Sequence, residues 1–198
     1  CAAAAMTFGP MSFAQQAPEK KDVTIAVGGK SLYYYLPLSI AEQLGYFKDE
    51  GLNVKIVDFQ GGSRSLQAVV GGSADVVSGA FEHTISMQAK KQPMTAFVLQ
   101  GRAPQLALVV SNKTMKDYKQ LSDLKGKKVG VTAPGSSSQM VANFILKKGG
   151  LGPKDVAFIG VGSSSGAVSA IRSGQIDALI NLDPVITILL KNGDAKLV

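Results

Sequence analysis

One stretch of the chain is written twice, and this repetition restricts the possible folds more than any other feature of the sequence. The first copy, residues 60–82, reads QGGSRSLQAVVGGSADVVSGAFE, and the second, residues 160–184, reads GVGSSSGAVSAIRSGQIDALINLDP. A shift of 102 positions pairs Ser63 with Ser165, Ala68 with Ala170, Val69 with Ile171, Gly72 with Gly174 and Asp75 with Asp177. We therefore expect one supersecondary unit at two places in the fold.

Each copy predicts a glycine-containing turn followed by a short helix. Gly61 and Gly62 permit a tight turn, and Ser63 or Ser65 can cap the helix of the first copy. The apolar face of that helix is expected to consist of Leu66, Val69 and Val70. The glycine-containing pairs at 71–72 and 173–174 are expected to end the two helices.

A short apolar run follows the helix in both copies, at residues 76–77 and 178–180. Such runs are typical of strands in a parallel sheet that is buried on both faces. Ligands of open α/β sheets bind beyond the carboxyl ends of the strands, which are residues 79–82 in one copy and 181–183 in the other. Two copies therefore predict an α/β protein with two lobes and a ligand-binding cleft between them.

The composition excludes several classes of function. The chain has 198 residues, a formal net charge of +7 and 45% hydrophobic residues, which suffices for a globular core. Lysine accounts for 18 of the 21 basic residues, and no arginine cluster, aromatic-basic interleaving or recognition helix indicates nucleic-acid binding. The single cysteine, Cys1, and the single histidine, His83, provide no disulfide framework, metal cluster or catalytic Cys–His pair. We therefore expect no metal, no cofactor and no catalytic residue.

Residues 1–17, CAAAAMTFGPMSFAQQA, form an alanine-rich apolar segment with a small-x-small pattern from Ser12 to Ala14. We interpret this segment as the remnant of a secretory signal peptide that is cleaved near Ala14 or Ala17. Alternatively, Cys1 is the lipidated residue of a lipoprotein, and the sequence leaves both interpretations open. No other stretch reaches the ~20 apolar residues that span a bilayer, so we expect an exported protein.

Further helices and strands are expected around the two copies. The expected strands are residues 22–27, 52–59, 94–99, 128–131 and 156–161. The expected helices begin at Ser31, with apolar positions Leu36, Ile40, Leu44 and Phe47, at His83, at Met140, with Val141, Phe144 and Ile145 buried, and at Pro184. Because the pattern changes near residues 101–104, we assign residues 18–104 to lobe 1 and residues 105–198 to lobe 2. The last residues look like the beginning of a strand, and we expect the protein to continue beyond them.

Four segments together carry a family resemblance: PLSIAEQLGYFKDEGLNVKI, GGSRSLQAVVGGSADVV, LKGKKVGVTAPGSSSQM and SGQIDALINLDPV. They resemble the periplasmic substrate-binding proteins of the nitrate/sulfonate/taurine type of ABC importers, a group that includes binders of aliphatic sulfonates and of thiamine pyrimidine precursors. The resemblance covers residues 22–198. It implies a type II periplasmic-binding-protein (Venus-flytrap) architecture, truncated in or after the second lobe because the family's chain normally returns to the first.

The same resemblance implies a monomeric periplasmic protein that closes on a small molecule and delivers it to a permease in the inner membrane. ATP hydrolysis belongs to a separate subunit in such importers, and this sequence contains no P-loop.

The ligand is expected to contact helix N-termini, whose free N–H groups bind anions, and side chains at the carboxyl ends of the strands. The predicted ligand-binding residues are Ser31, Tyr33, Tyr34, Ser63, Gly79, Ala80, Phe81, Glu82, Gly135, Ser136, Ser137 and Asp183. The glycine-serine turn at residues 135–137 is the preferred site for an anionic group, although it can equally be a simple helix cap. The tyrosines can stack on a flat ligand or pack in the core, and the two acids can accept hydrogen bonds from an amine or a pyrimidine. Arg64 and Arg102 are weaker candidates for pairing with an anion.

The leading hypothesis is a solute-binding protein for an anionic or zwitterionic, sulfonate-like or pyrimidine-like molecule. One alternative is an enzyme on the same fold, related to the synthesis of pyrimidine precursors. Such enzymes carry a cysteine-rich signature and catalytic lysine and histidine residues, whereas this chain has no cysteine after Cys1. Another alternative is the effector-sensing domain of a regulator. That class needs a DNA-binding helix-turn-helix upstream, where this chain has the signal-like segment.

Overall fold

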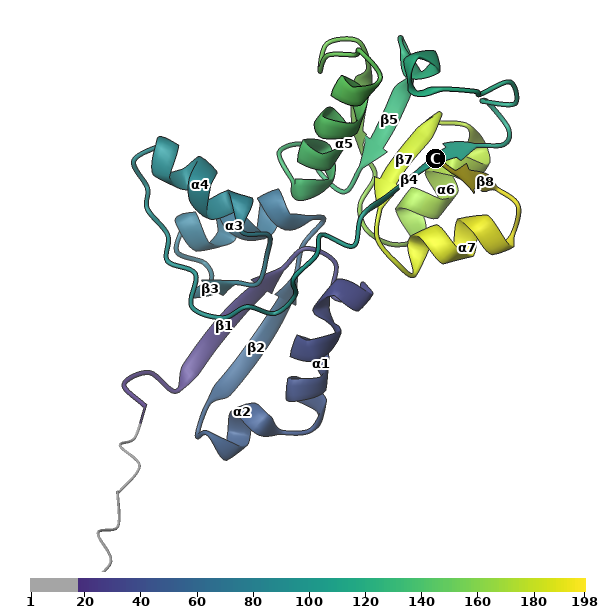
Figure 1. Ribbon diagram of the computed structural model, residues 1–198. Helices are drawn as coiled ribbons and strands as arrows, with labels where there is room; N and C mark the ends of the chain where they lie inside the picture. The colour runs from purple at the N-terminus through teal and green to yellow at the C-terminus, as the bar shows by residue number, and fades with distance from the viewer. Residues whose placement is uncertain (1–17) are drawn as a thin grey trace, which may run out of the picture.

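The computed structural model describes residues 18–198 and contains two separate β-sheets, each with helices on both faces (Figure 1). The segment on which the signal-peptide and lipoprotein interpretations depend, residues 1–17, lies outside the described residues. The first sheet has three strands in the order β2-β1-β3, and the second has five in the order β6-β5-β7-β4-β8. No helix among residues 18–198 is both long enough and apolar enough to cross a bilayer.

The first sheet consists of β1 (Asp22–Val27), β2 (Asn53–Asp58) and β3 (Val76–Val77), all parallel. Its helices are η1 (Tyr33–Tyr35), α1 (Leu36–Gln43), α2 (Tyr46–Asp49), α3 (Gly62–Val70) and α4 (Glu82–Ala89). In Figure 1, α1 and α2 lie on one face of this sheet and α3 on the other. Alternate residues of β1 point to opposite faces. Val27 therefore packs on the side of α1 with Tyr35, and Ala26 packs on the side of α3 with Ala68.

The second sheet consists of β4 (Ala107–Ser111), β5 (Lys128–Val131), β6 (Ala157–Gly160), β7 (Ala178–Asn181) and β8 (Ala195–Leu197). Strands β5, β6 and β7 are parallel to one another, whereas β4 is antiparallel to both β7 and β8. The helices of this half are η2 (Leu121–Leu124), α5 (Ser137–Lys148), α6 (Ser165–Ser173) and α7 (Val185–Lys191). All four residues of β7 are buried, as expected for a strand covered by helices on both faces.

The two repeated units occupy the same place in their sheets, which confirms the interpretation of the repeat. In the first sheet β2 and β3 flank β1, and in the second β6 and β7 flank β5 in the same way. The paired aspartates even make the same contacts. The Asp75 carboxylate accepts a hydrogen bond from the N–H of Thr24 in β1 at 2.8 Å, and the Asp177 carboxylate accepts one from the N–H of Lys128 in β5 at 2.9 Å. Each aspartate thereby holds the start of the central strand.

Several expectations about helix starts are wrong. The N-cap of α3 is Gly61 and not a serine, because the Ser65 hydroxyl donates to the Gly62 carbonyl within the helix. Ser31 caps no helix either, since the chain first forms the 3₁₀ turn η1 with Leu32 as its N-cap. The predicted helix ends are confirmed: Gly71 is the C-cap of α3, and Gly174 ends α6 in the left-handed conformation at φ 82°.

The apolar faces of three helices also differ from the prediction. In α1, Leu36 and Ile40 are exposed, as is Leu44 directly after the helix, whereas the fourth predicted position, Phe47, packs half-buried against the core of the first sheet. In α5, Phe144 is 62% exposed, because the buried face consists of Ser138, Ala142 and Leu146. In α3, Leu66 is buried as expected but Val70 is exposed. Helical spacing identified the helices, but it did not determine which side faces the sheet.

The strand expected at residues 94–99 does not form. This segment has neither helix nor strand assignment, and Phe97, Val98 and Leu99 are each more than 70% exposed. An isolated extended segment has no partner for its N–H and C=O groups, and within residues 18–198 no strand pairs with it. The boundary between the lobes at residues 104 and 105 stays a prediction, although no strand of either sheet crosses it.

Candidate functional site

A cavity of about 330 Å³ lies where the carboxyl ends of the two sheets meet. The first half contributes residues that follow β1 and β3 together with the first residue of α3. The second half contributes Thr132 after β5, the first turns of α5, and Leu182 after β7. Residues 101–104, which lead from one half to the other, complete the lining. The cavity is therefore built at the edge where parallel sheets hold ligands.

Glycines allow the backbones to approach closely beneath this cavity. A Cβ atom on Gly28 would lie 2.4 Å from both Gly61 C and Gly62 N, so no side chain fits at that position. Gly29 adopts φ +115°, and a Cβ atom there would lie 2.2 Å from the Ser163 hydroxyl of the second half. The loop after β1 can therefore touch α3 on one side and the second sheet on the other.

Direct contacts join the two halves at the same place. The N–H of Tyr33 donates to the carbonyl of Asp183 at 3.0 Å, and Leu182 packs into the core of the first sheet with Leu32 and Tyr35. These contacts hold the two sheets in the arrangement that forms the cavity.

Three residues at the starts of α3 and α5 form a further contact between the halves. The Ser63 N–H donates to the Ser136 hydroxyl at 2.9 Å, and the Ser63 hydroxyl donates to the Pro134 carbonyl at 2.8 Å. The Ser136 hydroxyl in turn donates to the Ser63 hydroxyl at 3.1 Å, and Ser136 is only 2% exposed. Sequence reasoning assigned both serines to a ligand, whereas in this structure they bind each other across the cleft.

Glu82 places a carboxylate in the cavity lining. Its Oε1 atom is buried and has no hydrogen-bond partner. Tyr34 lines the same cavity, and the pKa of its hydroxyl is raised above its usual value, first by burial and then by the nearby Glu82 charge. A buried acceptor without a partner is costly unless a donor satisfies it, so this oxygen is available to a donor group of a ligand.

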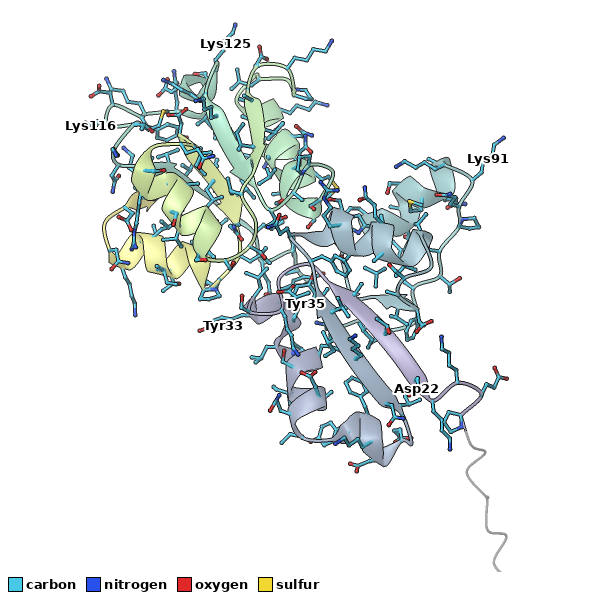
Figure 2. All side chains as sticks on the ribbon, turned by 180° about the vertical axis from the view of Figure 1, so that it is seen from behind. Asp22, Tyr33, Tyr35, Lys91, Lys116 and Lys125 are labelled. Carbon is cyan, nitrogen blue, oxygen red and sulfur yellow. The ribbon has the colours of Figure 1, made fainter. Side chains whose placement is uncertain are left out.

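The three consecutive tyrosines point in different directions, as expected at the start of a helix. Tyr33 is 61% exposed and extends into solvent, whereas Tyr35 lies inside (Figure 2). The Tyr35 hydroxyl accepts a hydrogen bond from the Gly28 N–H at 3.1 Å, and burial raises the pKa of this hydroxyl. Tyr34 packs edge-on against Tyr35, with ring centroids 5.0 Å apart. Only Tyr34 and Tyr35 line the cavity.

His83 lies directly behind this site, at the start of α4. It is 5% exposed, and neither ring nitrogen has a hydrogen-bond partner. Its ring packs against the backbones of Gly62 and Gly79, where an added Cβ atom would lie 3.1 Å and 3.6 Å from ring atoms. Burial lowers the pKa of His83 below its usual value, although the Glu82 charge and the Gly135 backbone act in the opposite direction. The ring is therefore a neutral packing group near pH 7.

A second cavity, of about 520 Å³, belongs to the first half alone. It lies between α1, β3 and the extended segment at residues 94–101, and its lining is mostly apolar, with Leu38, Phe47 and Phe97 among its residues. The second sheet contributes nothing to it, so a ligand there would not join the two halves. We therefore assign the candidate site to the smaller cavity.

The predicted ligand-binding residues divide into two groups. Those that line the smaller cavity are Tyr34, Ala80, Phe81, Glu82 and Ser137. Those that do not line it are Ser31, Tyr33, Ser63, Gly79, Gly135, Ser136 and Asp183. Gly79 borders the larger cavity instead, and the Asp183 carboxylate accepts the Thr187 N–H in the first turn of α7 at 2.9 Å. Ligand binding by any of these residues stays a prediction.

Several lining residues were missed by sequence reasoning, among them Gly28, Thr132, Met140 and Val141, whereas Leu182 belongs to the segment 181–183 that was expected to lie near a ligand. Gly28 and Thr132 follow directly after β1 and β5, so the rule about carboxyl ends of strands could have found them. Met140 and Val141 carried no such signal, because helical spacing does not show which side of α5 faces the other half.

The chain matches the model of the family described as NMT1/THI5 like over residues 33–191. The chain belongs to this family. A solved structure from Bordetella bronchiseptica RB50 is 64% identical, with a TM-score of 0.88 over 90% of this chain and 56% of that one. The alkanesulfonate-binding protein SsuA from Xanthomonas axonopodis pv. citri, bound to MOPS, is 23% identical, with a TM-score of 0.68 over 91% of this chain and 61% of that one. The fold is that of the periplasmic binding proteins, as the sequence predicted.

Two curated relatives carry different names. A 4-amino-5-hydroxymethyl-2-methylpyrimidine phosphate synthase of Schizosaccharomyces pombe is 27% identical over 81% of this chain and 45% of its own length. The putative binding protein YtlA of Bacillus subtilis is 26% identical over 83% of this chain and 50% of its own. The chain thus spans about half the length of these relatives.

Proposed function

We propose that this protein is the solute-binding component of an ABC importer, located in the periplasm, and that it delivers a small molecule to a membrane permease. The observation that carries the proposal is the cavity formed jointly by the carboxyl ends of both sheets. A ligand that touches both halves favours their closed arrangement over an open one, which couples binding to closure. Membership in the NMT1/THI5 like family and the fold shared with SsuA support this function.

The ligand that suits this cavity carries an N–H donor at one end. Glu82 provides a buried carboxylate oxygen without a partner on the wall formed by the first half. An amine or an amino-substituted ring nitrogen satisfies this oxygen, whereas nitrate or a simple alkanesulfonate offers no donor. The acid therefore favours a zwitterionic or pyrimidine-like solute over a purely anionic one.

The opposite wall suits an anionic or hydrogen-bond-accepting end. Ser137 is the first residue of α5 and lines the cavity from the second half. The N-terminus of a helix carries a partial positive charge and N–H groups that favour anions. Arg102, between the two halves, adds a cation to the lining. A ligand with a donor at one end and an anionic group at the other would contact both halves at once.

Aromatic side chains in the same lining suit a flat or apolar middle part of the ligand. Phe81 is 67% exposed in this structure and lines the cavity together with Tyr34. An aromatic ring buries a large apolar area when it contacts a ligand. Contact between the ligand and the exposed Phe81 ring would therefore stabilise the complex.

The second candidate is an enzyme, and the name of the synthase relatives favours it. The lining of the cavity supports binding instead, because its titratable side chains are Glu82, Arg102, Tyr34 and Tyr35. Nucleophilic catalysis by a serine or threonine hydroxyl needs a neighbouring general base to activate it. The serine and threonine hydroxyls in the lining are those of Ser137 and Thr132; the Thr132 hydroxyl shares a hydrogen bond of 2.9 Å with the Ser138 hydroxyl, and among residues 18–198 no basic side chain forms a hydrogen bond with either one.

A thermal-shift screen tests the proposal. The panel pairs taurine with ethanesulfonate and an aminopyrimidine with nitrate, so that it contains ligands with and without an N–H donor. A ligand at about 100 times its Kd adds roughly 2.7 kcal/mol to the free energy of unfolding, which raises Tm by roughly 5–11 °C in a protein of this size. We expect the donor-bearing ligands to raise Tm and the others to leave it unchanged.

The variant Glu82→Gln tests whether the carboxylate contributes to ligand binding, because the substitution removes the charge and keeps the size of the side chain. Glutamine keeps an acceptor oxygen but loses the charge, and a hydrogen bond to a charged group is worth about 1.5–3 kcal/mol against about 0.5–1.5 kcal/mol for a neutral one, so the affinity should fall roughly 5- to 12-fold. The exposed Glu19→Gln variant serves as the matched control and should bind as the native protein does. Equal affinity in Glu82→Gln would remove Glu82 from the site. Conversion of a bound ligand to a product, detected by mass spectrometry, would replace the binding function with the enzymatic one.

A further inference from the structure

Almost all of the net positive charge of the chain lies in two short segments. Residues 116–128 and 147–154 contain eight lysines and two aspartates, which gives them +6 of the formal +7 of the whole chain. All other residues together are therefore nearly neutral. We call these eight lysines the lysine pole.

The fold brings both segments to one end of the second sheet, away from the cavity. Lys128 begins β5, Lys154 precedes β6, and Lys148 is the last residue of α5. The cavity lies at the opposite ends of these elements, since Ser137 at the start of α5 lines it. Val141 is the last residue of α5 in the cavity lining, and a helix rises 1.5 Å per residue, so the stretch of α5 up to Lys147 separates the lining from the lysine pole by about 9 Å along the helix.

The lysine pole is open to solvent. Seven of its lysines are exposed, and Lys127 is half-buried. Figure 2 shows Lys116 and Lys125 extending outward at the end of the molecule that lies farthest from Asp22. Among residues 18–198, no ion pair within 4 Å joins a lysine of the pole to a carboxylate.

Three aspartates beside the pole accept hydrogen bonds from backbone amides instead, among them Asp155, which accepts the Gly152 N–H at 2.7 Å. The Asp123 carboxylate accepts hydrogen bonds from the N–H groups of Lys119 at 2.8 Å and Gln120 at 3.0 Å. Asp177 accepts the N–H of Lys128 in the same way, at 2.9 Å. These carboxylates bind backbone N–H groups at a turn and at the start of a strand. The lysine ammonium groups near them are therefore not paired with these carboxylates and can interact with an external anion.

We propose that the lysine pole binds the anionic surface of a phospholipid membrane. Many lysines at one end of a molecule are attracted together by a negative lipid surface, where each adds a small increment. Lysine is a hydrated point charge, whereas sites for single phosphates and nucleic acids favour the planar fork of arginine, and the pole contains no arginine. Neither of the two cavities borders the pole.

The contact is electrostatic and does not insert into the bilayer. No exposed large hydrophobic side chain belongs to residues 116–128 or 147–154, and Phe144, which contacts the pole, has the Lys148 ammonium group over its ring at 4.9 Å from the ring centroid. Binding must therefore weaken steeply with salt, because the Debye length falls from about 10 Å at 0.1 M to about 3 Å at 1 M. This inference goes beyond the proposed function and does not depend on the identity of the solute.

Vesicle co-sedimentation tests the inference with the purified protein. We expect binding to vesicles of phosphatidylcholine with added phosphatidylglycerol, no binding to phosphatidylcholine alone, and release by salt. The triple variant Lys116→Gln, Lys125→Gln and Lys154→Gln removes three exposed ammonium groups from the pole. Each is expected to weaken partitioning about fivefold at low ionic strength, so the variant should bind on the order of 100-fold more weakly.

The matched control removes the same charge elsewhere. Lys48→Gln, Lys55→Gln and Lys90→Gln are exposed positions in the half of the first sheet, and this triple variant should retain vesicle binding. Equal losses in the two variants would show that only net charge matters and would overturn the proposal. So would binding to neutral vesicles, or binding to a single-stranded DNA oligonucleotide in the absence of vesicle binding, which would identify the pole as a nucleic-acid site.

Discussion

Replacement of Gly28 by alanine is expected to destabilise the protein through one steric conflict beneath the cavity. The added Cβ atom would lie 2.4 Å from Gly61 C and Gly62 N, and both are backbone atoms that cannot rotate away. Carbon atoms pack at about 3.5 Å, so the loop after β1 and the start of α3 must separate by about 1 Å. Gly28 does not adopt a positive φ, and the cost is therefore steric and not conformational.

Overpacking of this kind costs typically 1–3 kcal/mol. For a protein of this length each kcal/mol lowers Tm by about 2–4 °C, so the thermal unfolding midpoint of Gly28→Ala should fall by roughly 2–12 °C. Differential scanning fluorimetry or calorimetry measures this change directly.

Gly101→Ala provides the matched control. Gly101 lines the same cavity, but a Cβ atom there would meet nothing within 4 Å, and its Tm should stay close to that of the native protein. If the two variants had the same Tm, the close approach of the loop after β1 to α3 would not contribute to stability, and the reasoning would be refuted.

Two further predictions concern buried polar groups. Burial lowers the pKa of His83 in the folded state. As the pH falls below about 6.5, the usual pKa of histidine, the unfolded chain therefore binds a proton before the folded one does. Below that pH the free energy of unfolding decreases with a slope of at most about 1.4 kcal/mol per pH unit. His83 is the only histidine, so Tm measured from pH 7 to pH 5 should fall less in His83→Gln, and parallel curves would contradict the assignment. Ser136→Ala leaves the Ser63 N–H without its acceptor and should cost about 1–3 kcal/mol, measured by urea unfolding. The exposed Ser122→Ala should cost almost nothing, and equal midpoints for the two serine variants would show that the contact between the halves adds no stability.

The repeat was the most informative part of the sequence because its content is local. Each helix ends beside a glycine in the left-handed conformation, Gly72 at φ 75° and Gly174 at φ 82°, which glycine adopts readily whatever packs around it. The apolar runs at residues 76–77 and 178–180 are short, and each forms a strand after a helix that crosses over the sheet, although the first is half-buried and only the second is fully buried. The residues that follow the carboxyl ends of those strands, which include Glu82, could therefore be placed near the site from the sequence alone.

The sequence determined that the chain forms two α/β halves from one repeated unit, and it indicated the edge of the sheets at which a ligand is expected. The tertiary structure alone decided that Ser63 and Ser136 bind each other, that Phe144 faces solvent and that residues 94–99 form no strand. The physical reason is the range of the interactions. Turns, caps and helical periodicity depend on neighbours in the chain, whereas burial and strand pairing depend on partners far away in the sequence, such as the 73 positions between those two serines.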